Sequence, residues 1–108
     1  MNPYVCVVGA VNLDICGRPE KKLIFRDSNP GAVTLTPGGV GRNIAHDLRL
    51  LGVEVKFLTA FGGESHAQLL RNDCVELGMD LSCALDVPGG RTSTYLYITD
   101  ERGEMQLG

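Results

Sequence analysis

The sequence predicts an α/β fold in which a central parallel sheet is flanked by helices, and three observations predict it. A short apolar run rich in β-branched residues, YVCVVGA, lies near the N-terminus at residues 4–10. Two segments with helical periodicity follow, and a glycine stands at the end of each. Strand patterns lie between and after these helices, and this β-α-β-α-β order is typical of a parallel sheet with right-handed crossovers.

Composition limits the classes of protein that the chain can belong to. Its 108 residues are 44% hydrophobic and 21% charged, which suits one globular domain with a modest core. Acidic and basic residues are interspersed around a net charge of −3, so we expect no nucleic-acid partner. No apolar run approaches the ~20 residues that span a bilayer, and the N-terminus lacks a basic leader region. We therefore expect no membrane partner and a cytoplasmic location.

The N-terminal third is expected to hold one buried strand and a hairpin. The continuous apolar character of residues 4–10 predicts a strand buried on both faces. Two shorter, half-polar pieces follow at 21–26 and 32–36, joined by the turn sequence DSNPG at 27–31. This pattern predicts a hairpin outside the main sheet.

The first helix is expected to begin at Asn43. Ile44, Leu48 and Leu51 then fall on one face, at positions i, i+4 and i+7. Gly52 is expected to end the helix, because glycine adopts the left-handed conformation that closes many helices.

The second helix is expected to begin with a capping box at 65–68. Its apolar face carries Leu70, Cys74 and Leu77, and Gly78 ends it. The remaining patterns predict a strand at 53–62 before this helix and further short strands after it, at 81–87, 91–99 and 104–107. Turn sequences at 88–90 and 100–103 separate the last three strands.

The segment TPGGVGRN, residues 36–43, is the first candidate site. Glycines before a helix expose backbone N–H groups at its positive end, where an anion or an electron-rich oxygen can bind. A dinucleotide-binding loop is disfavoured because the last glycine of its pattern is missing, and a phosphate-binding P-loop because Arg42 and Asn43 replace its Lys and Ser or Thr. The alternative is that these glycines serve only a tight turn.

Asn12 and Asp14 form the second candidate site. They follow the first strand and stand two residues apart, so an extended segment would place them on the same side. Ligands of open α/β sheets bind at this edge, and a carboxylate beside an amide suits the hydroxyls of a polyol. The alternative is a solvated turn in which both side chains cap the backbone.

Other polar residues are assigned no ligand. We expect the four cysteines to be buried, reduced thiols and predict no metal site; these are Cys6, Cys16, Cys74 and Cys83. His46 and His66 are expected to have surface or cap roles. Arg42 could face a phosphate, although solvent is the more common location for a side chain in the first helical turn.

Three segments together resemble the N-terminal part of the ribokinase-like, or phosphofructokinase-B type, family of sugar and nucleoside kinases: VVGAVNLD, PGGVGRNIA and LGVEVKFLTAFGGE. The resemblance implies that residues 1–108 are the N-terminal part of the kinase domain and a fragment of the full fold, with a small β lid formed by 15–36 and 90–107. Over 27–52 the resemblance is to nucleoside kinases and implies phosphorylation of the ribose 5′-hydroxyl of pseudouridine. A kinase for another nucleoside or sugar, and a non-catalytic polyol-binding or association module, stay open as alternatives.

The resemblance also implies roles for individual residues. Asn12, Asp14 and Asn43 would bind sugar hydroxyls through their side chains, and Gly39, Val40 and Gly41 through the backbone of their turn. Lid contacts are expected from Thr92, Thr94 and Tyr95, and the lid often builds a homodimer. ATP, Mg²⁺ and the catalytic base are expected in a C-terminal half outside these residues, so the chain is expected to carry no catalytic residue and to be inactive alone.

Overall fold

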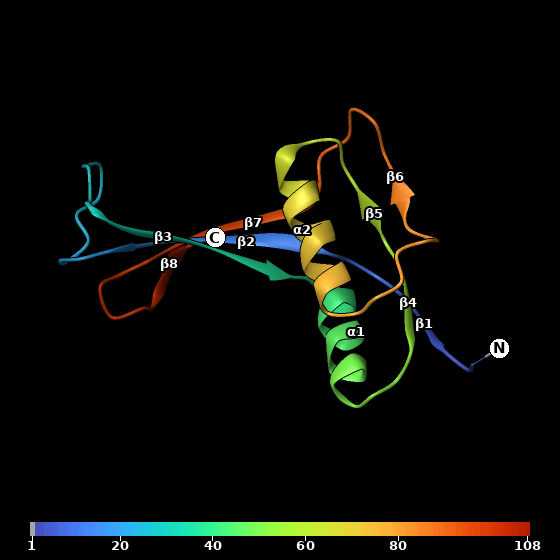
Figure 1. Ribbon diagram of the computed structural model, residues 1–108. Helices are drawn as coiled ribbons and strands as arrows, with labels where there is room; N and C mark the ends of the chain where they lie inside the picture. Colours follow the sequence, from blue (N-terminus) through green and yellow to red (C-terminus); the bar gives the residue numbers. More distant parts are fainter. Residues whose placement is uncertain (1) are drawn as a thin grey trace. The chain divides into compact units, whose positions relative to one another are not determined.

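The computed structural model describes residues 2–108, which divide into two compact units (Figure 1). The first unit comprises the residues up to Leu13 together with Pro37–Ser93. The second unit comprises Asp14–Thr36 and Thr94–Gly108.

The first unit is built from parallel strands and two helices: β1 (Val5–Val8), α1 (Val40–Leu50), β4 (Val55–Leu58), β5 (Ala60–Phe61), α2 (Ser65–Glu76) and β6 (Leu85–Asp86). β1 pairs in parallel with β4, and β5 pairs in parallel with β6. A parallel bridge between Lys56 and Asp80 lies between these pairings, where the Phe57 N–H donates to the Asp80 carbonyl at 2.9 Å. The predicted parallel β-α-β arrangement is therefore confirmed.

The expected burial of the first strand on both faces is wrong. Of the residues of β1, only Val7 is buried, whereas the side chains of Val5 and Val8 are 41% and 74% exposed. The reason is that one face of the strand is covered: Val7 lies on the same face as the buried Phe57, with which it pairs, whereas Val8 points to the opposite face and stays exposed.

Helix α1 begins at Val40, three residues before the predicted Asn43. Its end is confirmed: Gly52 has a φ of 81° and follows the C-cap. The Gly52 N–H donates to the Arg49 carbonyl at 3.0 Å and the Val53 N–H to the Leu48 carbonyl at 3.0 Å, which is the Schellman pattern.

Helix α2 is preceded by Glu64 as its N-cap, and no side-chain cap bond is made there, so the predicted capping box at 65–68 is wrong. The predicted end at Gly78 is confirmed by its φ of 85° and by a second Schellman pair, from Gly78 N–H to Val75 and from Met79 N–H to Cys74. Neither helix in the described chain has the length and apolar content that a membrane span needs.

The apolar core lies in the first unit and joins the inner faces of the strands to both helices. It contains Val7, Val11, Leu13, Ala45, Val55, Phe57, Phe61, Ala67, Leu70, Cys74 and Met79. The prediction that Leu70 and Cys74 face the core is confirmed. Burial raises the pKa of the Cys74 thiol to about 11, with the neighbouring Asp73 carboxylate as a second cause.

The expectation of four buried thiols is wrong for the other three cysteines. Cys6 and Cys83 are exposed, and Cys16 is half-buried. Cys6 belongs to the edge strand β1, and Cys83 lies in the turn that leads to β6. Those backbone positions, rather than the residue type, determine their exposure.

The second unit is centred on a four-stranded sheet with the order β3-β2-β7-β8. Its strands are β2 (Asn12–Pro19), β3 (Gly31–Gly38), β7 (Thr94–Thr99) and β8 (Met105–Leu107), and β7 pairs with β8 in antiparallel fashion. The predicted strand at 104–107 and the turn at 100–103 are confirmed, and β7 begins later than the expected residue 91.

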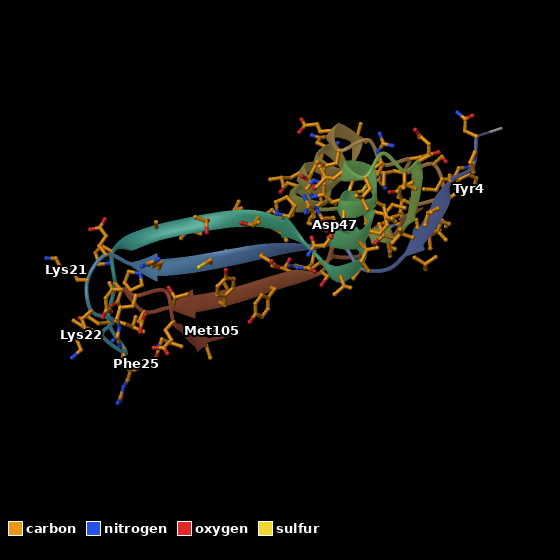
Figure 2. All side chains as sticks on the ribbon, turned by 90° about the horizontal axis from the view of Figure 1, so that it is seen from below. Tyr4, Lys21, Lys22, Phe25, Asp47 and Met105 are labelled. Atoms are coloured by element: carbon orange, nitrogen blue, oxygen red, sulfur yellow. The ribbon has the colours of Figure 1, made fainter. Side chains whose placement is uncertain are left out.

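The predicted strand at 21–26 is wrong, because these residues belong to the loop between β2 and β3. Asn29 organises this loop with both ends of its amide. Its Oδ1 accepts from the Ile24 N–H at 2.8 Å, and its Nδ2 donates to the carbonyls of Ile24 and Asp27, each at 2.9 Å. These bonds occupy backbone groups that a strand would use in pairing. Figure 2 shows the exposed side chains of Lys21, Lys22 and Phe25 on this loop.

Two further strand predictions are longer than the strands observed. The segment 53–62 is divided into β4 and β5, and the segment 81–87 contributes only β6. A turn replaces the start of the second segment: the Ser82 N–H donates to Asp80 Oδ1 at 2.8 Å, and the Ala84 N–H to the Leu81 carbonyl at 2.9 Å. The Ser82 N–H bond is the largest cause that lowers the pKa of the Asp80 carboxyl.

A buried carboxylate closes the β7–β8 turn of the second unit. Asp100 is 8% exposed, and its Oδ1 accepts from the backbone N–H groups of Arg102 and Glu104, each at 2.9 Å. These bonds, with that from Glu104 first, hold the pKa of the Asp100 carboxyl below its usual value.

Candidate functional site

The glycine-rich turn packs against the chain's own backbone. Gly39 is the N-cap of α1 with a φ of 101°, and a Cβ there would lie 2.5 Å from the Ala10 carbonyl oxygen. A Cβ on Gly41 would lie 2.7 Å from the carbonyl carbon of Gly9. Both distances are shorter than real Cβ contacts, and the atoms met are backbone. These two glycines are therefore required by the fold, whatever ligand the turn binds.

The first turn of α1 leaves two backbone donors open. The Arg42 N–H donates to the Ala10 carbonyl at 3.1 Å, and the Asn43 N–H makes the first helical bond, to Gly39, at 2.9 Å. Within residues 2–108, no backbone acceptor is found for the N–H groups of Val40 and Gly41. They stand at the positive end of the helix dipole, where an anion or a polyol oxygen can accept from them.

Asn12 lies beside this turn. It follows Val11, and a Cβ on Gly39 would lie 2.9 Å from the Val11 Cα. Asn12 is the first residue of β2, and Asp14 is the third, so the alternative of a solvated turn is wrong for both residues. Their two-residue spacing on one strand gives them the common side that was predicted. Asp14 belongs to the second unit.

Arg42 does not extend into solvent, and it does not point a free guanidinium at a ligand. Its Nε and Nη2 bind Asp73 Oδ2 and Oδ1 at 3.0 and 3.2 Å. Its Nη1 donates to the Asn43 Oδ1 at 3.2 Å. Sequence reasoning missed Asp73, because 31 residues separate it from Arg42 and only the packing of α1 near α2 brings them together.

Thr92 is a buried residue of the first unit. Its side-chain oxygen accepts from the Gly62 N–H at 2.9 Å, and its own N–H donates to Glu64 Oε1 at 3.0 Å. The hydrogen bond with Thr92 is the first cause that lowers the pKa of the Glu64 carboxyl. Thr92 thus joins the start of α2 to the segment before β7. In the sequence, the GGE pattern at 62–64 is the feature from which this link could have been predicted.

The other two expected lid residues begin β7 in the second unit. Thr94 is the first residue of that strand, and Tyr95 is the second. The Tyr95 ring stacks on Tyr97 with centroids 5.2 Å apart, and its hydroxyl donates to the Met105 sulfur at 3.3 Å.

The histidines are half-buried, His46 in α1 and His66 in α2. In the part of the chain that the structure describes, no group of three or more His, Cys, Asp or Glu side chains is arranged to hold a metal ion.

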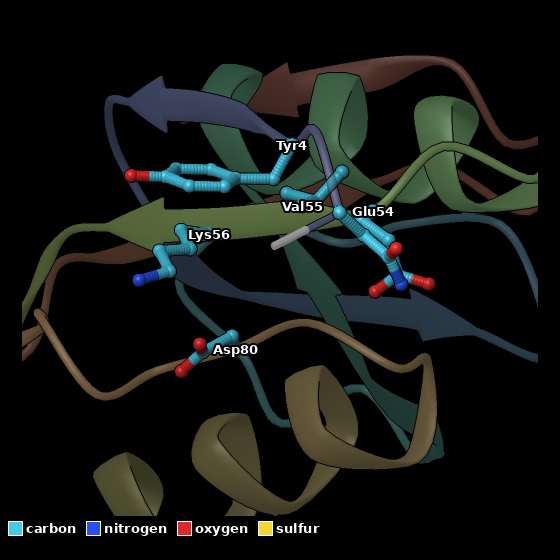
Figure 3. A pocket seen from close by; sticks show the side chains of 6 residues that line it. Tyr4, Glu54, Val55, Lys56 and Asp80 are labelled. Carbon is cyan, nitrogen blue, oxygen red and sulfur yellow. The ribbon is translucent and has the colours of Figure 1, made fainter.

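A cavity of about 250 Å³ opens at the other end of β1 (Figure 3). Tyr4, Lys56 and Asp80 contribute to its lining, and the Lys56 Nζ lies 4.6 Å from the centroid of the Tyr4 ring. Tyr4 and Lys56 lie at the start of β1 and β4, whereas ligands of α/β sheets bind at the carboxyl ends of the strands. The glycine-rich turn stands at the carboxyl end and is the better candidate.

Comparison with known proteins extends this assignment. Residues 2–108 match the family model "pfkB family carbohydrate kinase". The chain is 43% identical over 102 residues to pseudouridine kinase of Escherichia coli strain K12, covering 94% of the chain and 33% of that relative. It is 38% identical over 104 residues to the uncharacterized sugar kinase YeiI of the same organism, covering 96% and 29%. The chain thus spans about a third of the length of these curated relatives.

Solved structures give the same fold. A crystal structure from Clostridium perfringens is 34% identical with a TM-score of 0.89, covering 98% of this chain and 34% of that one. Ribokinase of Arabidopsis thaliana, complexed with ribose and ATP, is 21% identical with a TM-score of 0.84, covering 100% and 36%. The predicted ribokinase-like α/β fold is confirmed. The family match over nearly the whole length shows that the chain belongs to the pfkB family of carbohydrate kinases.

Proposed function

We propose that these residues are the N-terminal part of an ATP-dependent nucleoside kinase that phosphorylates the ribose 5′-hydroxyl of pseudouridine. The observation that carries the proposal is the 43% identity, across 94% of the chain, to a relative named pseudouridine kinase. The 38% identity to a sugar kinase without an assigned substrate supports a second candidate, a kinase for another nucleoside or sugar. In both cases ATP, Mg²⁺ and the catalytic base belong to the longer protein beyond these residues.

In this proposal the first unit binds the sugar at the start of α1. The N–H groups of Val40 and Gly41 donate to ribose oxygens, and Asn12 and Asn43 contribute amides that can donate or accept. Gly39 holds the turn against the Ala10 carbonyl, which keeps these donors in place. A bare backbone lets the sugar approach closely, so the glycines serve the ligand as well as the fold.

The family resemblance also assigns substrate contacts to residues of the second unit. Asp14 accepts hydrogen bonds from ribose hydroxyls, since an ionised carboxylate is an acceptor only. The same resemblance assigns nucleoside contacts to Thr94 and Tyr95, whereas Thr92 is buried and its side chain already accepts from Gly62. The exposed apolar side chains of β7 and β8 pack against a second copy of the protein; these include Leu96 at 58% and Leu107 at 69% exposure.

The test is a phosphoryl-transfer assay on the complete protein that contains this chain, with pseudouridine, other nucleosides and free sugars as acceptors. Pseudouridine is expected to give the highest kcat/KM. A higher value for another acceptor would select the second candidate, and no transfer to any acceptor would contradict both.

Variants of the complete protein test the site. A hydrogen bond to a charged group contributes ~1.5–3 kcal/mol, so Asp14→Ala is expected to lower kcat/KM by about ten- to a hundredfold or more. Asp47→Ala is the matched control, because Asp47 is an exposed carboxylate on α1 (Figure 2). Equal kcat/KM values for the two variants would remove Asp14 from the site.

A further inference from the structure

Arg42 connects the start of α1 to α2 through a two-pronged ion pair. Nε and Nη2 of its guanidinium meet the two carboxylate oxygens of Asp73 at 3.0 and 3.2 Å. The Arg42 and Asp73 side chains are only 13% and 22% exposed. A bidentate pair sheltered from water fixes the plane of the guanidinium as well as its position. The remaining amino group, Nη1, is therefore held in a defined place.

That remaining amino group binds Asn43. The Arg42 Nη1 donates to the Asn43 Oδ1 at 3.2 Å. An asparagine amide has one acceptor end and one donor end, and a flipped amide would set its NH₂ group against the guanidinium, donor against donor. The bond therefore selects one orientation of the Asn43 side chain, in which the NH₂ group is the end left for another partner.

The backbone of Arg42 is anchored as well. Its N–H donates to the Ala10 carbonyl, two residues before Asn12. The same residue thus binds α2, the segment that leads into β2, and the side chain of Asn43. An ion pair that served only to hold two helices together would need neither of the last two contacts.

We propose that Arg42 is a positioning residue, held by Asp73, which presents the Asn43 amide as a hydrogen-bond donor to a sugar oxygen of the substrate. The proposal rests on the proposed function, because it assigns the orientation of a residue in that site. Asn43 requires an acceptor on the substrate, and Arg42 acts only through Asn43.

The first test is a double-mutant cycle on kcat/KM for the nucleoside in the complete protein, with Arg42→Ala and Asn43→Ala made singly and together. Arg42→Ala is expected to lower kcat/KM by about tenfold, mainly through KM, and to add less than about twofold in the Asn43→Ala background. A loss of equal size in both backgrounds would overturn the proposal. Arg49→Ala is the matched control, since Arg49 lies on the same helix and pairs with Glu54 instead.

The second test does not depend on activity. In the complete protein with labelled asparagine, NMR scalar couplings across χ1 of Asn43 and NOEs from its Nδ2 protons are expected to report one rotamer and one amide orientation, and Arg42→Ala to give averaged couplings. Asp73→Ala should do the same, whereas Asp73→Glu, which keeps the charge, should restore part of the order. Rotamer averaging of Asn43 in the unsubstituted protein would overturn the proposal. Loss of kinase activity towards every acceptor would instead contradict the proposed function, and the couplings would still decide the role of Arg42.

Discussion

The two units differ in what they bury. Apart from Pro19, all the buried apolar residues found among residues 2–108 belong to the first unit, including Phe57, Phe61 and Leu70 at 0% exposure. In the second unit the buried residues include the polar Thr99 and Asp100, while apolar side chains such as Leu96 lie on the surface. The first unit thus carries a hydrophobic core of its own, and the second depends on strand pairing and on one carboxylate.

This difference shows which part can be stable by itself. Small sheets without a packed face are marginal in water, because strand pairing alone does not offset the loss of chain entropy. Exposed apolar side chains on such a sheet mark a surface that another element covers. We therefore expect the first unit to resist unfolding more than the second, and amide hydrogen exchange can follow each unit separately.

Among the substitutions in the first unit, we expect one in the glycine turn to lower the free energy of unfolding most. Gly39→Ala places a Cβ 2.5 Å from the Ala10 oxygen, and both the clash and the positive φ oppose it. We expect a loss of ~3 kcal/mol or more in the free energy of unfolding. Gly52→Ala is the control, because Gly52 has a φ of 81° but no atom within 4 Å of the added Cβ, so only ~1–2 kcal/mol should be lost. Equal losses in urea denaturation would show that Gly39 does not pack as described.

The same substitution, leucine to alanine, can be made in each unit to compare how much stability a leucine contributes there. Leu70→Ala empties a site at 0% exposure and is expected to cost ~2–5 kcal/mol in the free energy of unfolding. Leu96→Ala removes a side chain at 58% exposure and should cost about 0.5 kcal/mol or less. A large cost for Leu96→Ala, growing with protein concentration, would show that a second copy already covers this surface.

The carboxylate of the second unit predicts a dependence on pH. The Asp100 pKa is lower in the folded chain than in the unfolded one, so the stability it contributes is present above the ordinary value of about 4 and is lost as pH falls through the folded value. Hydrogen-exchange protection of the β7–β8 turn should fall over this acid range, while α1 keeps its protection. Asp100→Asn should lower protection of the turn at pH 7 and abolish its acid dependence. An unchanged acid dependence in this variant would assign it to another group.

The smallest effect concerns the cavity at the start of β1. Lys56→Met removes the cation 4.6 Å from the Tyr4 ring centroid and should cost ~0.5–1 kcal/mol in the free energy of unfolding. Lys22→Met, in the exposed loop of the second unit, is the control and should cost almost nothing. Salt should reduce the cost of the first substitution and leave the second unaffected.

Helix ends could be predicted from the sequence better than helix starts. Gly52 and Gly78 end α1 and α2 because a left-handed residue closes a helix locally, and the residue type reveals it. The start at Val40 depends on the contact between Gly39 and Ala10, which lie 29 positions apart in the chain, so no local pattern contains it. Tertiary contact, rather than propensity, determines where α1 begins.

The candidate site also contains a part that could be predicted from the sequence and a part that could not. Asn12 and the glycine turn could be associated from the sequence, because both follow strand or turn signals at one edge of an α/β sheet. The pairing of Arg42 with Asp73 could not, since it depends on how two helices pack. The burial of β1 was overestimated because an apolar run does not reveal whether both faces of its strand are covered.

The contact of Gly39 and Gly41 with Gly9 and Ala10 bears on how such proteins diverge. After gene duplication, a copy released from selection for catalysis would still be under selection to fold. Substitutions at these glycines would be removed in that copy as they are in an active enzyme. A sequence pattern built on GGVG therefore recognises the fold as well as the site, and positions outside this turn are needed to tell an active kinase from an inactive copy.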